Sequence, residues 1–380
     1  MTVGAFESPF EDAQDAPRIG VGMLGYAFMG KAHSAAYRTL PHLLQPPPVI
    51  PSLVSIAGRD RAAVAAAAKR YGFRMSTTDW RTLVEDPEVS VLDNGAPNSV
   101  HAEPTIAAAE AGKHVICEKP LGRTADEAFE MWRRVAAAGV VHMTAFNYRF
   151  VPAVRLAREI VASGQLGEVV HFRGSYLQDW GQGAGSSWRF IAAEAGSGSL
   201  GDLGAHLIDL ARYLVGDIES VFAALQTIDR SHEVDDGFQA LIEFSDGARG
   251  TIEASRFALG HKNALCWEIN GTLGSLIFNL ERLNELAWSS GDSGFRVISV
   301  TDPGHPFMHQ WWPPGHTIGW EHTFVHELHH FLTAVATDGS IGPHGATFED
   351  GYRAAEICEA IIRSAMSGRC EEVAYRTLGT

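Results

Sequence analysis

The 380-residue sequence has few of the features that mark secreted, membrane-bound or nucleic-acid-binding proteins. It has only four cysteines, none of them in a C-x-x-C pair, which indicates a reduced, cytoplasmic protein. No apolar run approaches the roughly 18 residues that a membrane span requires. Lys and Arg total 30 against 45 Asp and Glu, a formal net charge of -15, and the basic residues do not cluster. Such a chain repels phosphate backbones and anionic lipids, so we expect neither a nucleic-acid nor a membrane partner.

Residues 1–17 contain acidic side chains but neither a basic start nor an apolar segment. We therefore expect a flexible tail there, not a targeting signal. The composition of the chain, with 46% apolar and 20% charged residues, is typical of a globular protein. Because 380 residues exceed what one hydrophobic core usually organises, the length favours two domains.

The first part of the chain alternates between strand-like and helix-like segments. Short apolar runs predict strands at 18–24, 53–57, 89–94, 114–117 and 141–146. Helical patterns lie between them at 31–40, 61–71, 101–111 and 125–138. This alternation predicts a parallel sheet with helices on both faces, so we expect an α/β Rossmann domain over residues 18–148.

The pattern changes in the second part, where strands follow one another after a helix at 152–163. We expect strands at 169–177, 220–227, 237–244, 248–256, 264–270 and 274–279, with hairpin connections at 245–247 and 271–274. Helices at 201–214, 323–337 and 348–367 would cover only one face of the resulting sheet. We therefore expect an α+β domain over residues 149–380, with a large, mostly antiparallel open sheet whose free face forms the contact of a homo-oligomer.

A glycine-rich turn follows the first predicted strand and opens the first helix. Its sequence, Gly25-Tyr26-Ala27-Phe28-Met29-Gly30, is a G-x-A-x-x-G variant of the dinucleotide fingerprint. Free amides at such a helix start bind a pyrophosphate, so we expect NAD(P) there. The second strand ends in Gly58-Arg59 where an NAD-binding protein usually carries an acid. Arg59 could neutralise a 2′-phosphate, which favours NADP, or it could be a solvated surface residue.

Two further motifs carry groups suited to hydride transfer. Lys119, in Cys117-Glu118-Lys119-Pro120, follows the strand at 114–117, at the sheet edge where ligands collect. Asp202 and His206 lie four residues apart on a predicted helix and would share a face. We expect His206 to take the proton of a substrate hydroxyl, with Asp202 orienting it and favouring its charged form. Each motif alone also fits a structural role. Lys119 could lie in a surface loop, and Asp202 and His206 could be an ordinary pair on a helix face.

These motifs, in this order over nearly the whole chain, resemble the Gfo/Idh/MocA family of glucose-fructose oxidoreductase and inositol dehydrogenase. The motifs are the turn at Gly25 to Gly30, Ala96-Pro97-Asn98-Ser99-Val100-His101, Glu118-Lys119-Pro120, Phe146-Asn147-Tyr148-Arg149-Phe150, and Asp202 with His206. The resemblance implies a Rossmann domain that binds NAD(P) and a second domain whose open sheet packs in dimers or tetramers. Ala27 departs from the family's usual glycine.

The resemblance also implies roles for individual residues. Lys119, Asp202 and His206 match the catalytic lysine, aspartate and histidine. Pro97, Asn98 and His101 would line the cofactor groove, and Glu118 and Asn147 would flank the nicotinamide. The positions implied for the substrate pocket are Tyr148, Arg149, Gln178, Asp179, Trp188 and Arg189. Tyr148 and Trp188 suit the apolar face of a sugar ring.

A competing motif is His326-Glu327-Leu328-His329-His330, which fits the H-E-x-x-H zinc signature of a metalloprotease class. It has no evident third ligand and falls where the family has a late helix, so we expect no metal. His316 and His322 follow an aromatic, proline-rich loop at 307–314, which could close over a pocket or form a subunit contact.

The sequence therefore predicts an NAD(P)-dependent oxidoreductase, with the NADP form favoured. Its expected substrate is a secondary hydroxyl or ketone of a sugar, anhydrosugar, glucoside or inositol-type cyclitol. A ketosugar or biliverdin-like reductase that consumes NADPH is an alternative within the same chemistry. A cofactor-binding regulator without catalysis is an alternative outside it, although the presence of Lys119, Asp202 and His206 together opposes that interpretation.

Overall fold

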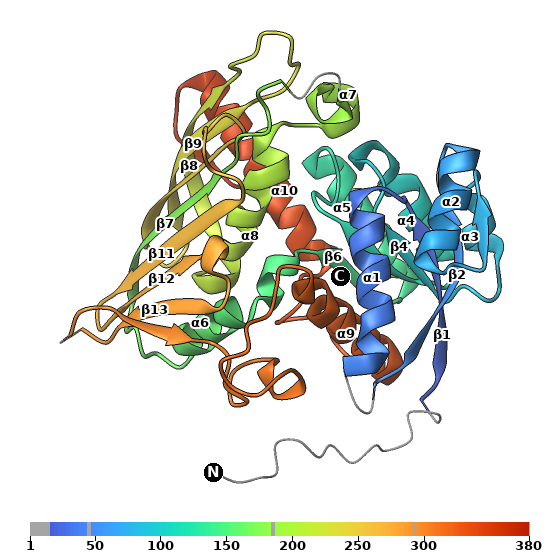
Figure 1. The fold of residues 1–380 in the computed structure, drawn as a ribbon. Coiled ribbons are helices and arrows are strands. Elements are labelled where there is room, and N and C mark those ends of the chain that lie inside the picture. The colour runs from blue at the N-terminus through green and yellow to red at the C-terminus, as the bar shows by residue number, and fades with distance from the viewer. Residues whose placement is uncertain (1–15, 44–46, 184–186, 292, 380) are drawn as a thin grey trace.

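Two β-sheets lie side by side with helices between and around them (Figure 1). The structure is a computed structural model that describes residues 16–43, 47–183, 187–291 and 293–379. The tail predicted at 1–17 therefore lies almost entirely outside the described residues. Across the described chain, no helix has both the length and the apolar character needed to cross a membrane.

The first sheet is parallel, as the alternating pattern predicted. In the described chain it has the strand order β3-β2-β1-β4-β5-β6. The strands are β1 (Arg18–Leu24), β2 (Ile50–Ala57), β3 (Met75–Thr77), β4 (Val91–Asn94), β5 (His114–Glu118) and β6 (His142–Ala145). The helices are α1 (Phe28–Leu43), α2 (Arg61–Tyr71), α3 (Arg81–Glu85), α4 (Ala102–Glu110) and α5 (Ala125–Ala138). The sequence did not predict β3 and α3, which are too short to show a hydrophobic period.

Local capping explains why two helices of this half match their predicted bounds. The Asp60 side chain accepts a hydrogen bond from the Ala63 amide at the start of α2, and Gly72 ends that helix with φ 90°. Thr124 caps α5 through the Glu127 amide in the same way. Cap residues and a left-handed glycine are readable from sequence because they act on neighbouring residues.

The second sheet has mixed strand directions, mostly antiparallel. Its order in the described chain is β14-β13-β12-β11-β7-β10-β9-β8-β15, and only β7 and β10 pair in parallel. Its strands are β7 (Val169–Leu177), β8 (Ile218–Gln226), β9 (Gly237–Phe244), β10 (Arg249–Ser255), β11 (Ala264–Gly271), β12 (Ser275–Asn279), β13 (Glu285–Ser289), β14 (Arg296–Ser299) and β15 (Glu371–Glu372). Both predicted hairpin connections are present, whereas β13, β14 and β15 were not predicted.

The helices of the second half are α6 (Pro152–Ala162), α7 (Ala192–Ala195), α8 (Ala205–Leu214), α9 (His322–Thr337) and α10 (Phe348–Ser367). α8 and α10 lie between the two sheets (Figure 1). The expectation that 323–337 covers the large sheet is wrong, because α9 packs on α1 instead. Its Phe324 and Leu328 join the core that contains Val21 of β1. A hydrophobic stripe shows that a helix is buried but not against which partner.

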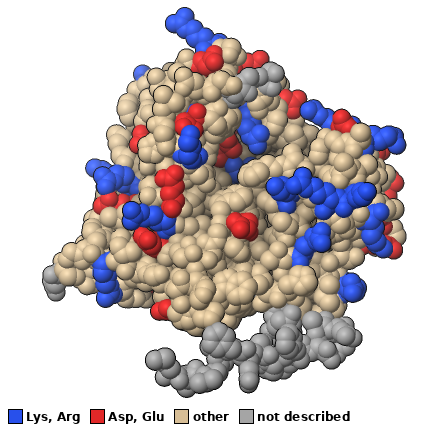
Figure 2. Space-filling model, viewed as in Figure 1, with Lys and Arg blue, Asp and Glu red and all other residues tan. Residues whose placement is uncertain are grey.

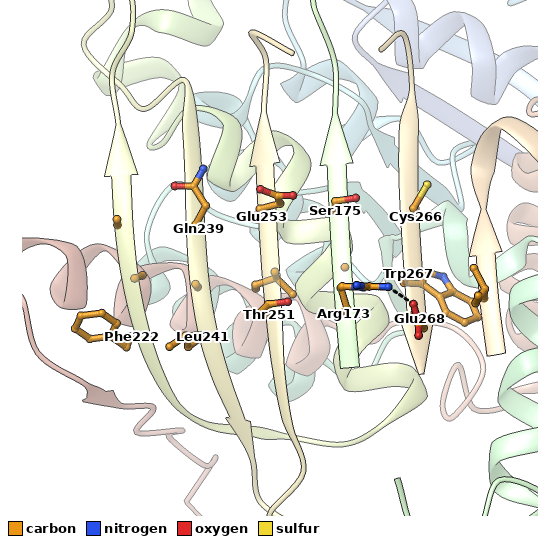
Figure 3. Close-up of a pocket in the computed structure, with 16 residues that line it drawn as sticks. Arg173, Ser175, Phe222, Gln239, Leu241, Thr251, Glu253, Cys266, Trp267 and Glu268 are labelled. Atoms are coloured by element: carbon orange, nitrogen blue, oxygen red, sulfur yellow. Dashed lines mark hydrogen bonds and ion pairs between the residues drawn. The ribbon is translucent and has the colours of Figure 1, made fainter. Parts of the chain in front are cut away.

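The other face of the large sheet carries no helix among the described residues. Figure 3 shows side chains of β7 to β11 on this face, including Phe222 and Leu241. These two side chains are 46% and 57% exposed. Between them and Trp267 the sheet forms a shallow, mainly apolar hollow. The expectation of an open face is confirmed for the described chain.

Candidate active site

A cavity of ≈ 700 Å³ lies between the two halves, at the carboxyl ends of the parallel strands. Figure 2 shows a hollow at this place with basic side chains in it. The parallel sheet lines it with Ala27, Phe28, Met29, Gly95, Ala96, Pro97, Asn98, Glu118, Lys119, Pro120 and Asn147. The second half contributes Tyr148, Tyr176, Gln178, Trp180, Trp188, Arg189, Ala195, Ser197, Asp202, Leu203, His206, Arg256, Lys262, Asn263, Trp320 and Phe324. Most of the predicted site residues therefore meet in one cavity.

The glycine-rich turn has the shape that a dinucleotide pyrophosphate requires. Gly25 has φ 100°, and a Cβ on it would lie 2.6 Å from the Gly95 carbonyl oxygen. A Cβ on Gly30 would lie 2.2 Å from the Gly25 oxygen. Both positions thus require glycine, and the first amides of α1 face the cavity where the strand order reverses between β1 and β4. The residues present fit a bound dinucleotide.

Two predicted cofactor residues lie elsewhere. His101 is fully buried, with its ring nitrogens 3.0 Å from the Ala96 oxygen and 2.9 Å from the Pro120 oxygen, and it does not line the cavity. It joins the two loops that flank the groove, because main-chain carbonyls occupy both sides of its ring. Arg59 is exposed beyond the end of β2 and is not among the residues that line the cavity. Beside it, a Cβ on Gly58 would lie 2.3 Å from the Tyr26 ring, so an acid has no space there.

Lys119 and Asp202 form the polar centre of the cavity. The Lys119 Nζ lies 3.1 Å from Asp202 Oδ1 and donates to the Asp202 main-chain oxygen at 2.8 Å. Arg256 holds the other carboxylate oxygen, with Nη2 3.0 Å from Oδ2. Burial alone would raise the pKa of Asp202, but Lys119 and Arg256 outweigh it and hold that pKa well below its usual range. Asp202 is therefore a carboxylate bridging two cations.

His206 lies beside this centre as a neutral imidazole. Its ring packs against Tyr148, with ring centroids 4.4 Å apart, and its Nδ1 is buried without a hydrogen-bond partner. Burial, and then the charge of Lys119, lower the pKa of His206 well below its ordinary value. Asp202 raises the pKa of His206, as predicted, but does not outweigh burial and Lys119. The expected role of Asp202 in orienting His206 has no hydrogen bond to support it in the described chain. From the π-helical turn Leu200–Gly204, the Asp202 carboxylate instead accepts from Lys119 and Arg256.

Tyr148, Gln178 and Trp188 line the cavity, as predicted for substrate contact. Tyr148 and Gln178 belong to a continuous hydrogen-bond network. Tyr148 and Tyr176 share a hydrogen bond between hydroxyls at 2.9 Å, and Tyr176 and Gln178 donate to Asn263 Oδ1 at 2.6 and 2.7 Å. This wall of hydroxyls and amides suits a polyhydroxylated substrate.

Two other predicted pocket residues do not contact the cavity. Asp179 forms an ion pair with Lys262, with Nζ 2.6 Å from Oδ2, and lies outside the cavity lining. Arg149 is buried and its guanidinium binds Asp209 at 2.6 Å, so it joins the 3-10 turn at Asn147–Phe150 to α8. Asp179 pairs with an amine and Arg149 with a carboxylate, and neither partner is close to it in the sequence. Arg189, by contrast, lines the cavity as predicted.

Sequence reasoning did not identify Arg256, Asn263, Tyr176 or Trp320, all of which line the cavity. Arg256 follows β10 and is 1% exposed, with its guanidinium carbon 4.8 Å from the centre of the Trp180 ring. The burial of Arg256 could not be predicted from the sequence, because the sheet topology alone brings the end of β10 to Asp202. Asn147 lines the cavity as predicted and donates to Thr323 Oγ1 at 2.9 Å.

The H-E-x-x-H histidines have other partners in the structure. His326 Nδ1 lies 2.9 Å from the Phe150 oxygen, and its Nε2 accepts from Trp311. His330 Nε2 lies 2.8 Å from the Ile341 oxygen. Among the residues that the structure describes, no three His, Cys, Asp or Glu are placed to hold a metal. His316 is exposed and lies beside the Pro313 oxygen, and His322 Nδ1 accepts from the Gly319 amide, so neither lines the cavity.

Comparison with known proteins agrees with this geometry. Residues 19–146 match the sequence model described as an oxidoreductase family with an NAD-binding Rossmann fold, and residues 154–277 match the GFO/IDH/MocA C-terminal domain. The chain is 44% identical to levoglucosan dehydrogenase of Pseudarthrobacter phenanthrenivorans over 378 residues, which covers 91% of this chain and 96% of the relative.

Two further relatives agree. Scyllo-inositol 2-dehydrogenase (NAD(+)) of Bacillus subtilis is 31% identical over 65% of this chain and 72% of that protein. The solved structure of levoglucosan dehydrogenase in complex with NADH and levoglucosan is 44% identical, with a TM-score of 0.90, and covers 94% of this chain and 99% of that one. The chain therefore belongs to the Gfo/Idh/MocA family of oxidoreductases with an NAD-binding Rossmann fold.

Proposed function

We propose that the protein oxidises a secondary hydroxyl of a pyranose-type sugar, with an anhydrosugar such as levoglucosan as the first candidate. The observation that carries this proposal is the meeting of Lys119, Asp202 and His206 at one point of a cavity that also contains the dinucleotide turn. The relative that acts on levoglucosan matches over nearly its whole length, whereas the inositol relative matches over 72% of its length. The anhydrosugar is therefore favoured over a cyclitol.

Different residues of the chain accept the proton and stabilise the charge in this reaction. Bound NAD(P) would accept the hydride from the carbinol carbon. The Lys119 ammonium hydrogen-bonds the carbinol oxygen and stabilises the negative charge that develops on it. Asp202 fixes that ammonium through Oδ1 while Arg256 fixes Asp202. The neutral His206 accepts the hydroxyl proton at Nε2, because its Nδ1 is buried.

We infer that NAD is the preferred cofactor, and not the NADP that the sequence pattern at Arg59 favoured. Arg59 lies next to Asp60, whose carboxylate caps α2, so the pair brings no net positive charge to a 2′-phosphate. The relatives named above were described with NADH or NAD(+). Initial rates with NAD and NADP for the protein and for Arg59→Ala test this. A more than tenfold preference for NADP that Arg59→Ala abolishes would reverse the inference.

The experiment for the activity is a substrate panel followed by absorbance of the reduced cofactor. Levoglucosan, glucose, xylose and myo- and scyllo-inositol are compared, with Lys119→Met and His206→Gln as variants. We expect the highest kcat/KM with levoglucosan, and losses of about 10²-fold or more in both variants. Equal rates in the variants would refute the assignment of Lys119 and His206. NADH binding without turnover of any substrate would favour the regulator alternative.

We also propose that a second copy of the chain covers the open face of the large sheet. That face presents Phe222 and Leu241 to solvent in the described chain. The ion pair between Arg173 and Glu268 lies beside them (Figure 3). Apolar side chains with a few paired charges are typical of the interface of a stable homo-oligomer.

A further inference from the structure

A buried cluster of charged groups lies directly behind the cavity wall. His33 of α1 is fully buried, with Nδ1 2.9 Å from Asp93 Oδ2 and Nε2 3.1 Å from Glu118 Oε1. Asp93 is on β4 and Glu118 ends β5, so the two carboxylates come from adjacent parallel strands. We call His33, Asp93 and Glu118 the His33 cluster. Glu118 belongs to the Glu118-Lys119-Pro120 motif, whereas neither the motifs nor the proposed chemistry uses His33 or Asp93.

The surroundings of the His33 cluster determine its charge. Each imidazole nitrogen faces a carboxylate oxygen, and only an imidazolium can donate from both nitrogens. Burial would lower the pKa of His33, but Asp93 and then Glu118 outweigh it and raise that pKa well above the ordinary value. Tyr37 of α1 and Glu327 of α9 also face the cluster, and burial keeps the pKa of both well above their ordinary values. Both are therefore neutral.

Glu118 connects this cluster to the catalytic site. Its carboxylate lines the cavity, and its Oε2 accepts the main-chain amide of Lys119 at 3.1 Å. Its Oε1 lies 3.1 Å from His33 Nε2, an ion-pair contact without hydrogen-bond geometry, so the charge of His33 holds this oxygen. β4 and β5 form the second half of the doubly wound sheet, where the nicotinamide end of a dinucleotide is expected. A carboxylate fixed at this point both orients the Lys119 main chain and places negative charge near the ring that becomes positive on oxidation.

We propose that His33 is a positioning residue of the catalytic site, which fixes the Glu118 carboxylate against the cofactor end of the cavity and thereby fixes Lys119. The proposal rests on the proposed function in that it assumes the nicotinamide lies at β4 and β5. A buried ion cluster with a purely structural role would stabilise the fold without affecting catalysis or cofactor affinity. The two roles therefore differ in what a change at His33 should alter.

The first test is the charge state of His33 in the cofactor-free protein. We expect ¹⁵N NMR of labelled histidine to show both His33 nitrogens protonated at pH 8, with the signal assigned by its loss in His33→Gln. A single protonated nitrogen that titrates near pH 6.5 would overturn the proposal. This readout does not depend on any substrate, so it stays decisive even if the sugar assignment fails.

The second test separates positioning from stability. His33→Gln keeps one amide donor but cannot bind both carboxylates, and we expect kcat to fall about 10- to 100-fold with KM for the sugar within about twofold. We also expect the affinity for NAD, whose ring is cationic, to fall more than the affinity for NADH. The matched control is His142→Gln, since His142 is partly buried at the start of β6, does not line the cavity, and accepts from the Phe348 amide.

His142→Gln should lower the midpoint of thermal unfolding without changing kcat or the ratio of NAD to NADH affinity. If His33→Gln lowers only the unfolding midpoint, as the control does, the role is structural and the proposal fails. Should His33→Gln not fold, Glu118→Gln provides the same measurement from the cavity side. Its amide keeps the shape but loses the charge, so an unchanged NAD to NADH affinity ratio would equally overturn the proposal.

Discussion

The partner of Asp202 decides which pair of residues forms the catalytic unit, and a double-mutant cycle measures it. The sequence pattern couples Asp202 to His206, whereas the structure couples it to Lys119 at 3.1 Å and to Arg256 at 3.0 Å. Asp202→Asn keeps the shape of the side chain and removes its charge. We combine it with Lys119→Met in one cycle and with His206→Gln in another, so that each cycle isolates one interaction.

The expected coupling follows from the contact distance and the exposure of the pair. Two unit charges 3.1 Å apart attract by about 5 kcal/mol at an effective dielectric constant of about 20. The Lys119 and Asp202 side chains are 14% and 24% exposed, so solvent and the desolvation cost offset part of this attraction. We expect a coupling energy of about 2 kcal/mol, or roughly 30-fold in kcat/KM. The coupling between Asp202 and His206 should stay below about 1 kcal/mol.

The assay is the initial rate of NADH formation with the best substrate of the panel, alongside thermal unfolding of each variant. Asp202→Asn should lower kcat/KM strongly in the wild-type background and little in the Lys119→Met background. The control is Glu110→Gln, which breaks an exposed ion pair with Arg134, neither residue lining the cavity, and should change kcat/KM less than about threefold. A larger coupling energy between Asp202 and His206 than between Asp202 and Lys119 would refute this reasoning. It would show that Asp202 and His206 act as a pair.

Three further predictions test the fold and its surfaces. Glu327→Gln should stabilise the protein at neutral pH, because burial raises the Glu327 pKa well above 4.5 in the native state. The native state therefore loses stability as the pH rises above 4.5, where the carboxyl ionises in the unfolded chain. A gain in the unfolding midpoint that does not shrink toward pH 4 would contradict this. Gly30→Ala should weaken NADH binding at least tenfold by fluorescence titration, since its Cβ would contact the Gly25 oxygen, whereas Gly216→Ala, which meets no atom within 4 Å, should not. Leu241→Lys should reduce the molecular mass measured by light scattering if a second copy covers the sheet; an unchanged assembly would exclude this face as the interface.

Much of the fold was predictable from sequence because its signals are local. Caps, hairpin turns and apolar periodicity act between neighbours, so α2, α5, β7, β9 and α10 match their predicted bounds. The glycines at 25 and 30 were also readable, since the backbone of one turn requires them. The elements that were missed are short, and a strand of two or three residues leaves no period to detect.

The candidate site was predictable only as far as its motifs extend. Lys119, Asp202, His206 and the dinucleotide turn were identified from the order of motifs and meet in one cavity. The partners of these groups were not, because Arg256 reaches Asp202 from the end of β10, and His33 lies between carboxylates of two strands that follow it in the chain. Asp179, Arg149 and His101 have the residue types of a site, yet none of the three lines the cavity, because another group of the fold binds each side chain.

By itself, the sequence determined most of the strands and helices and the candidate residues for the chemistry, since both follow from side chains and their near neighbours. Only the tertiary structure decided which charges face each other. Lys119 follows β5, Arg256 follows β10 and Asp202 lies in the turn before α8, so their approach in space makes Asp202 a bridge between Lys119 and Arg256, and burial leaves His206 neutral. Electrostatic energies depend on distance and burial in space, and neither quantity can be read from separation along the chain.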